Sequence, residues 1–169
     1  MRKNHKLAGI IVIAISILIL VLFYFFSGDS KTLQPSLKKT IDFTLSDLKG
    51  NEISLSGMKG KVVLLTFWST RCRLCQKEVA LLKKIHGIYD GKRVEILAVD
   101  VGESDFVVKR FKSDEGIAYR ILLDREAFVA RIYGVMGVPT DIIVDREGVV
   151  RYYGFGWPDN LEEIINSLL

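Results

Sequence analysis

The pattern of hydrophobic and polar positions after residue 40 switches between the period of a strand and the period of a helix. Segments 42–45 and 52–55 alternate polar and apolar residues around a turn-rich stretch, which predicts a β-hairpin. Two apolar runs, 62–68 and 93–99, predict buried strands. The other predicted elements are helices over 76–88, 105–112, 125–133 and 159–169, and strands over 119–123, 141–144 and 149–153.

The order of these elements predicts an α/β domain over residues 41–169. Strands that alternate with helices form a parallel sheet with both faces covered, because each crossover helix packs on the sheet. The last two strands are joined by the turn 145–148 and add an antiparallel edge. We therefore expect a mixed central sheet with flanking helices and an N-terminal β-hairpin.

An uncharged apolar segment precedes this domain. Residues 7–26 carry no formal charge and are long enough to span the hydrocarbon layer of a membrane. Basic residues lie before the segment, within residues 1–6, so the positive-inside rule puts the N-terminus in the cytoplasm. The prediction is a single transmembrane anchor at 7–26, a linker at 27–40, and a domain at 41–169 on the periplasmic side or the outer face of the cell membrane.

A cleaved signal peptide is the competing interpretation of the same segment. Its apolar core is normally shorter and ends in small residues before the cleavage site. The aromatic run 23–26 is a poor cleavage context. We therefore favour an uncleaved signal-anchor.

The chain carries a formal net charge of +4 at pH 7. Its basic and acidic residues are interspersed, and beyond the N-terminal segment no basic run is longer than two residues. Such a pattern is typical of a mixed, solvated surface. We therefore expect no nucleic-acid partner.

The two cysteines have the most informative placement. Cys72 and Cys75 are the only cysteines of the chain, spaced Cys-x-x-Cys between the predicted strand and the predicted helix. A helix start offers unpaired N–H groups and partial positive charge, which favour the nucleophilic thiolate. A disulfide that closes so short a loop removes little entropy from the unfolded chain. The spacing therefore favours a redox-active dithiol, with an inert disulfide or unrelated buried thiols as the alternative.

Three motifs make the chain from about residue 42 onwards resemble one family. They are Phe-Trp-x-x-x-Cys-x-x-Cys at 67–75, Val-Gly-Glu-Ser at 101–104 and Gly-Val-Pro-Thr at 137–140. This combination is similar to the TlpA/ResA-like group of thioredoxin-fold proteins, which are membrane-anchored, extracytoplasmic thiol-disulfide oxidoreductases. The resemblance implies a thioredoxin-like fold with a central insertion, preceded by one transmembrane helix.

The resemblance also implies roles for individual residues. Cys72 would be the attacking thiolate and Cys75 the less exposed, resolving cysteine. Pro139 would be in the cis form against the sulfurs, leaving the backbone of Val138 free to pair with an extended substrate. Two further residues would support the site: Trp68, as a packing residue below the dithiol, and Thr140.

A proton must move when the resolving cysteine attacks. Thioredoxins place a buried acid six residues before the first cysteine, where this chain has Thr66. ResA-like proteins instead place a glutamate near the cysteines from the loop after the next strand, and Glu103 matches that position. The expectation is a partly buried Glu103 with a raised pKa. The alternative is an exposed acid at the start of a helix.

Two positions around the first cysteine depart from the family pattern. Arg71 stands where the family usually has an aromatic residue, and Leu74 where it usually has proline. Arg71 and Arg73 flank Cys72 with positive charge, which stabilises a thiolate and makes the disulfide more oxidising. These departures leave the direction of electron flow open, while the family pattern favours reduction of protein disulfides.

The predicted function is that of an extracytoplasmic thiol-disulfide oxidoreductase that reduces a disulfide-containing client protein through Cys72 and Cys75. Reduction of apocytochrome c in cytochrome c maturation is a family precedent. The chain has no nicotinamide or flavin motif, so we expect no cofactor beyond the redox-active disulfide. Reducing equivalents would come from a membrane thiol-electron carrier, and we expect a monomer.

Two alternative functions share features with this interpretation. A structural zinc site needs four ligands, and the predicted outer domain has two cysteines and one histidine, His86. Copper chaperones of this fold use a histidine from a later loop, which this sequence lacks. Thiol peroxidases of the peroxiredoxin kind carry Pro-x-x-x-Thr/Ser-x-x-Cys, but no proline lies between Pro35 and Pro139. We therefore expect no metal site, and keep the peroxidase and the copper chaperone as alternatives.

Overall fold

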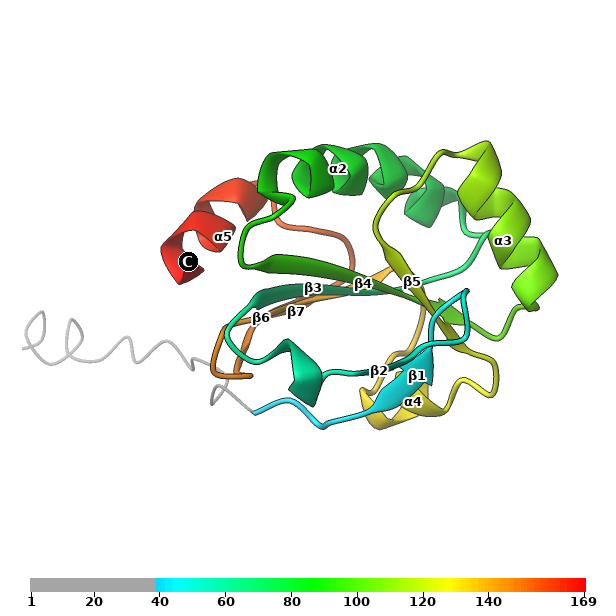
Figure 1. The fold of residues 1–169 in the computed structure, drawn as a ribbon, viewed down its shortest axis with the longest axis horizontal. Coiled ribbons are helices and arrows are strands. Elements are labelled where there is room, and N and C mark those ends of the chain that lie inside the picture. Colours follow the sequence, from blue (N-terminus) through cyan, green and yellow to red (C-terminus); the bar gives the residue numbers. More distant parts are fainter. Residues whose placement is uncertain (1–38) are drawn as a thin grey trace, which may run out of the picture. The chain divides into compact units, whose positions relative to one another are not determined.

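The computed structural model describes residues 39–169 (Figure 1). The predicted cytoplasmic segment 1–6, the anchor 7–26 and nearly all of the linker 27–40 lie outside the described residues, and their assignment stays a prediction. Within residues 39–169, none of the helices has both the length and the hydropathy that crossing a membrane requires.

The elements follow one another in the predicted order. The strands are β1 (Thr44–Ser46), β2 (Glu52–Ser54), β3 (Val62–Trp68), β4 (Val94–Val101), β5 (Arg120–Asp124), β6 (Thr140–Val144) and β7 (Val150–Gly154). The helices are the short 3-10 helix η1 (Ser56–Met58), α2 (Arg73–Tyr89), α3 (Asp105–Asp114), α4 (Phe128–Ile132) and α5 (Leu161–Leu168).

The main sheet is five-stranded, in the order β5-β4-β3-β6-β7. β4 pairs in parallel with both β3 and β5, whereas β6 runs antiparallel to β3 and β7 antiparallel to β6. The α/β fold with a mixed central sheet is therefore confirmed, and β3 lies at its centre.

All seven residues of β3 are buried because both faces of the sheet are covered. Alternate side chains such as Leu64 belong to a core shared with α2, α3 and α5. Their neighbours, such as Leu65, belong to a second core shared with α4 and the β1–β2 hairpin. Figure 1 shows the three helices on one side of the sheet and the hairpin with α4 on the other. This two-sided burial explains why the sequence shows a continuous apolar run there rather than alternation.

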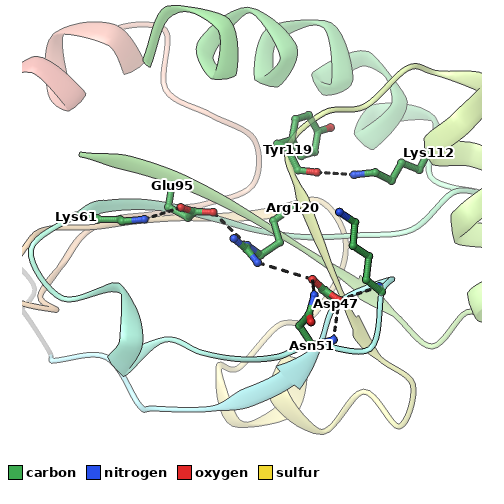
Figure 2. Close-up of polar contacts among 8 residues, drawn as sticks. Asp47, Asn51, Lys61, Glu95, Lys112, Tyr119 and Arg120 are labelled. Carbon is green, nitrogen blue, oxygen red and sulfur yellow. Dashed lines mark hydrogen bonds and ion pairs between the residues drawn. The ribbon is translucent and has the colours of Figure 1, made fainter. Parts of the chain in front are cut away.

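The predicted hairpin is confirmed, and its turn is fixed to the edge of the main sheet by polar contacts (Figure 2). The Asp47 carboxylate accepts hydrogen bonds from the backbone and the side chain of Asn51, both at 2.9 Å. Arg120 on β5 lies 3.8 Å from Asp47 and 3.2 Å from Glu95. Lys61 completes the chain of charges with an ion pair to Glu95 at 2.9 Å.

Two helices begin three residues away from their predicted start. α2 begins at Arg73, three residues earlier than expected, so Cys75 lies inside its first turn. α4 covers only part of 125–133, because Ala127 adopts a left-handed φ of 52° immediately before it. The Asp124 carboxylate at the end of β5 then accepts the N–H groups of Phe128 and Ala130, each at 2.8 Å, and fixes the helix start there.

Candidate active site

The two cysteines form a disulfide at the N-terminus of α2. Cys72 is the N-cap residue, and its sulfur accepts the N–H of Cys75 at 3.1 Å. Cys72 is half-buried, whereas Cys75 is buried with 3% exposure. The expected order of exposure is therefore present. In the reduced protein the same N–H group and the partial charge of the helix start would stabilise a thiolate on Cys72.

The loop before β6 lies against this disulfide. The Val138–Pro139 peptide bond is cis, as expected. The Cys72 sulfur lies 3.6 Å from the carbonyl oxygen of Val138, and the Thr140 hydroxyl donates to the Gly137 carbonyl at 2.6 Å. Residues 66 positions apart in the sequence thus meet at the site. The pairing of Val138 with a substrate stays a prediction.

Glu103 reaches the loop that leads into Cys72. Its carboxylate accepts the backbone N–H of Thr70 at 2.6 Å and the Thr70 hydroxyl at 2.9 Å. The guanidinium of Arg71 lies 3.3 Å from the same carboxylate. Glu103 is buried, with 8% exposure, so it is not an exposed acid at a helix start. Its contacts fix Thr70 and Arg71, the two residues that precede Cys72.

The expectation of a raised pKa for Glu103 is wrong. Burial alone would raise the pKa of this carboxyl, but hydrogen bonds from Thr70 and Asp100 and the charge of Arg71 together lower it. The raised pKa belongs instead to its neighbour Asp100, where burial, the hydrogen bond to Glu103 and the charge of Glu103 raise the pKa to about 8. Near neutral pH, Glu103 is therefore ionised and Asp100 holds the proton of this pair.

Glu103→Gln is expected to destabilise the fold at neutral pH by about 1–3 kcal/mol, the usual cost of weakening buried hydrogen bonds to a charged group. Because the pKa of Glu103 lies below its ordinary 4.5, the carboxylate stabilises the folded state above pH 4.5. This contribution is lost as the pH falls through the lowered value. Urea unfolding at neutral and at acidic pH should show a difference between wild type and variant that shrinks in acid.

The control for this prediction is Glu162→Gln, which removes the carboxylate of an exposed ion pair with Lys84. Exposed pairs contribute about 0–1 kcal/mol, so this variant should change little at either pH. A Glu103→Gln variant as stable as wild type at neutral pH would contradict the anchoring of the loop by Glu103.

The arginines around Cys72 are not equivalent. Arg71 is 83% exposed at its side chain and pairs with Glu103, so much of its charge is balanced there rather than at the sulfur. Arg73 is exposed at the first residue of α2. Solvent weakens the effect of both charges on the sulfur. Leu74, which stands between the cysteines, is 47% exposed.

Trp68 is a packing residue, as expected. It is buried at the end of β3, and its ring lies 5.3 Å from that of Phe111 on α3. Together with Cys75 it lines a small cavity of about 10 Å³ under the dithiol. Trp68 therefore supports the floor of the site.

Two acidic residues near the dithiol were not expected from the sequence. Glu78 follows Cys75 by three positions on α2 and lines the same cavity. Asp141 is fully buried on β6 and pairs across the sheet with Thr66 on β3. Each left a signal in the sequence. Glu78 has the helical spacing that puts it on the face of Cys75, and Asp141 is a charged residue in an otherwise apolar strand.

Most of the chain is similar in sequence to a known protein family and to thiol-disulfide oxidoreductases. The AhpC/TSA family matches residues 37–153. The thiol-disulfide oxidoreductase ResA of Bacillus thuringiensis (strain Al Hakam) is 34% identical over 152 residues, which cover 89% of this chain and 87% of that protein. ResA of Geobacillus thermodenitrificans (strain NG80-2) is 35% identical over 153 residues, which cover 89% of this chain and 88% of that protein.

Solved structures share the fold. The thioredoxin domain of a thiol-disulfide oxidoreductase from Bacteroides vulgatus has a TM-score of 0.71 at 26% identity, over 79% of this chain and 97% of that chain. StoA from Bacillus subtilis has a TM-score of 0.63 at 22% identity, over 75% of this chain and 95% of that chain. The likeness to StoA shows the fold alone.

The active site of a thioredoxin-fold thiol-disulfide oxidoreductase is a redox-active disulfide at a helix start, beside a cis-proline loop. This protein has both features and belongs to that class. Its sequence identity to relatives over nearly their whole length narrows the class further. The chain belongs to the AhpC/TSA family and, among its members, to the ResA thiol-disulfide oxidoreductases.

Proposed function

We propose that this oxidoreductase is a membrane-anchored reductant of protein disulfides outside the cytoplasm. The observation that carries the proposal is the unequal exposure of the cysteines, with a half-buried Cys72 capping α2 and a buried Cys75 behind it. The more exposed sulfur of Cys72 can contact the disulfide of a client, whereas the buried sulfur of Cys75 can react only with Cys72. The named relatives, which are thiol-disulfide oxidoreductases, support the same chemistry.

The reaction takes two exchange steps. The Cys72 thiolate attacks one sulfur of the client disulfide, which forms a mixed disulfide and releases the second client sulfur as a thiolate that takes up a proton. Cys75 then loses its proton and attacks Cys72. The Cys72–Cys75 disulfide forms, and the first client sulfur leaves as a thiolate. The client gains two electrons and the protein loses two, so a membrane thiol-electron carrier would restore the dithiol.

The surface around Cys72 suits an extended client segment with apolar side chains. Met136, two residues before Val138, is 99% exposed, and Leu74 is 47% exposed. Leu74 stands between the cysteines and Met136 precedes the loop residue that contacts Cys72, so both would lie near a client bound at this sulfur. Val138 is half-buried, and its backbone would supply hydrogen bonds to the client. Apocytochrome c is one client of this description, and we expect the protein to act as a monomer.

Location and cofactor use complete the proposal. The uncharged segment 7–26 and the basic residues before it support a single anchor with the N-terminus in the cytoplasm. The dithiol carries both electrons of the exchange, so the reaction as written uses no metal or organic cofactor. Metal analysis of the purified protein, with less than stoichiometric metal expected, tests this part.

The reduction potential of the detergent-solubilised chain tests the direction of electron flow. We expect a value nearer that of thioredoxin, about −270 mV, than that of the strong oxidant DsbA, about −120 mV. Arg71 pairs with Glu103, and both Arg71 and Arg73 are exposed to solvent. The two charges should therefore raise the reduction potential only slightly. The measurement equilibrates the protein with dithiothreitol buffers and follows the two thiols by alkylation.

Arg73→Ala is the matched variant for this measurement, since Arg73 flanks Cys72 from an exposed position. It should change the potential by less than about 30 mV, which corresponds to about 1.4 kcal/mol. A wild-type potential close to that of DsbA would instead make the protein an oxidase or isomerase of its clients.

A further inference from the structure

Arg73 is a charged residue that neither the fold nor the exchange reaction uses. It is the first residue of α2, follows Cys72 directly and is exposed. Within residues 39–169 its side chain takes part in none of the ion pairs. A cation at a helix start is also unfavourable, because that end of the helix already carries partial positive charge. A residue that breaks a local rule without a compensating contact inside the domain points to a role outside it.

Arg71 adds a second positive charge on the other side of Cys72 in the sequence. Its Nε atom lies 3.3 Å from the Glu103 carboxylate, yet its side chain is 83% exposed. Arginine carries several N–H donors in a planar fork. A guanidinium that is paired at Nε therefore keeps other donors for a further partner.

Neighbouring acidic groups do not cancel these charges at the surface. The first turn of α2 contains no acidic residue, and Glu103 is paired with Arg71. Asp100 holds a proton at pH 7, because burial raises its pKa to about 8. Burial likewise raises the pKa of Glu78 to about 8 and that of Asp141 to about 6, so of these two only Asp141 is ionised, and it is fully buried. The surface beside the attacking sulfur is therefore positively charged.

We propose that Arg73 and Arg71 are specificity-determining residues, which bind carboxylates beside the reactive cysteine of the client and so select acidic client segments. The inference rests on the proposed function and names the class of client. Arginine can bind a carboxylate through a pair of parallel N–H···O hydrogen bonds, which suits it to this contact. Leu74, between the cysteines and 47% exposed, would contact an apolar side chain of the same segment.

The effect is expected on the rate at which Cys72 and the client meet. Exposed ion pairs contribute little to the stability of a fold, because solvent screens them. Charges at the rim of a binding surface act mainly on the association rate, and this effect weakens as salt is added. The quantity to measure is therefore the second-order rate constant of disulfide exchange, at low and at high ionic strength.

The test compares three peptide disulfides that differ only in the residues beside their cysteines, which are glutamate, glutamine or lysine. The reduced full chain, in an uncharged detergent, is mixed with an excess of each peptide at pH 7. Acid quenching and alkylation follow the loss of the protein thiols. For each protein, the rate constant for the glutamate peptide is divided by that for the lysine peptide. Comparing this ratio between variants cancels the intrinsic reactivity of the peptides and any change in the reactivity of the Cys72 thiolate.

Arg73→Glu should lower this ratio about tenfold or more at an ionic strength of about 0.01 M, because attraction to a carboxylate becomes repulsion. Arg73→Gln, which only removes the charge, should give an intermediate ratio. Arg71→Gln should lower the ratio by a smaller factor, because Arg71 is paired with Glu103. At about 1 M salt the Debye length is about 3 Å, and the difference between wild type and Arg73→Glu should shrink to about twofold.

Arg93→Glu is the matched control. Arg93 is an exposed arginine directly before β4, beside the first residue of β3, whereas the dithiol follows the other end of β3. The same reversal of charge there should leave the ratio unchanged. The inference is overturned if Arg73→Glu keeps the wild-type ratio, as it would if Arg73 acted only on the reactivity of Cys72, or if Arg93→Glu lowers the ratio equally. Failure of the proposed function would appear differently, as a reduced wild-type protein that loses its thiols to none of the three peptides.

Discussion

Cys72→Ser is expected to abolish disulfide exchange, lowering the rate by about a thousandfold or more, as happens when a catalytic nucleophile is removed. Cys72 is the half-exposed sulfur of the pair and the one that accepts the N–H of Cys75 at 3.1 Å. A serine hydroxyl is not ionised at neutral pH and cannot form the mixed disulfide. Cys75, with 3% exposure, is too buried to replace it. Reduction of a model protein disulfide, followed by thiol release, measures the loss.

The control for this variant is Lys77→Ser, which introduces the same residue on an exposed position of α2. It should retain the wild-type rate, and both variants should have the same circular dichroism. If Cys72→Ser kept more than about a tenth of the activity, another group would have to be the nucleophile, and the assignment of the two cysteines would fail.

The sequence was sufficient to predict the fold because its main signals are local. The run 62–68 became β3 because both faces of the central strand are buried, which leaves a continuous apolar stretch. The helix boundaries were harder to predict because they depend on side chains. The α2 start depends on the Cys72 sulfur as a cap, and the α4 start on Asp124, which belongs to the preceding strand.

The site was predictable only in part. The meeting of Cys72 with the Val138–Pro139 loop rested on the family resemblance, since no local pattern joins residues so far apart. The position of Glu103 near the dithiol was also predicted from the family resemblance. The direction of its pKa shift was not, because the hydrogen bonds from Thr70 that lower this pKa depend on how a loop is folded. Burial alone would have raised the pKa.

The proximity of Glu78 and Asp141 could not be predicted from sequence patterns. Their proximity depends on the antiparallel register that sets Asp141 opposite Thr66, and on the face that α2 turns to the sheet. The local signs are limited to a charged residue in an apolar strand and a glutamate three positions after Cys75. Such a residue is worth examining wherever a fold places it under a reactive group.

Cys75→Ser is expected to trap the client, because the variant can complete the first exchange but not the second. Cys72 keeps its N–H donor from the backbone of residue 75 and its exposure, so it still attacks. Serine at the buried position cannot displace the client sulfur, and the mixed disulfide persists. We expect a covalent complex in cells that produce this variant, detected on a non-reducing gel as a band that dithiothreitol removes.

The double variant Cys72→Ser with Cys75→Ser is the matched control, since it lacks both sulfurs and should form no such band. The wild type should show only a trace, because Cys75 resolves each complex from directly behind Cys72, with 5.2 Å between the two Cα atoms. A band of equal strength in the Cys72→Ser single variant would reverse the roles of the two cysteines. Absence of any band in Cys75→Ser would mean that Cys72 does not attack protein disulfides. Mass spectrometry of the trapped partner identifies the client and so decides whether cytochrome c maturation is the process served.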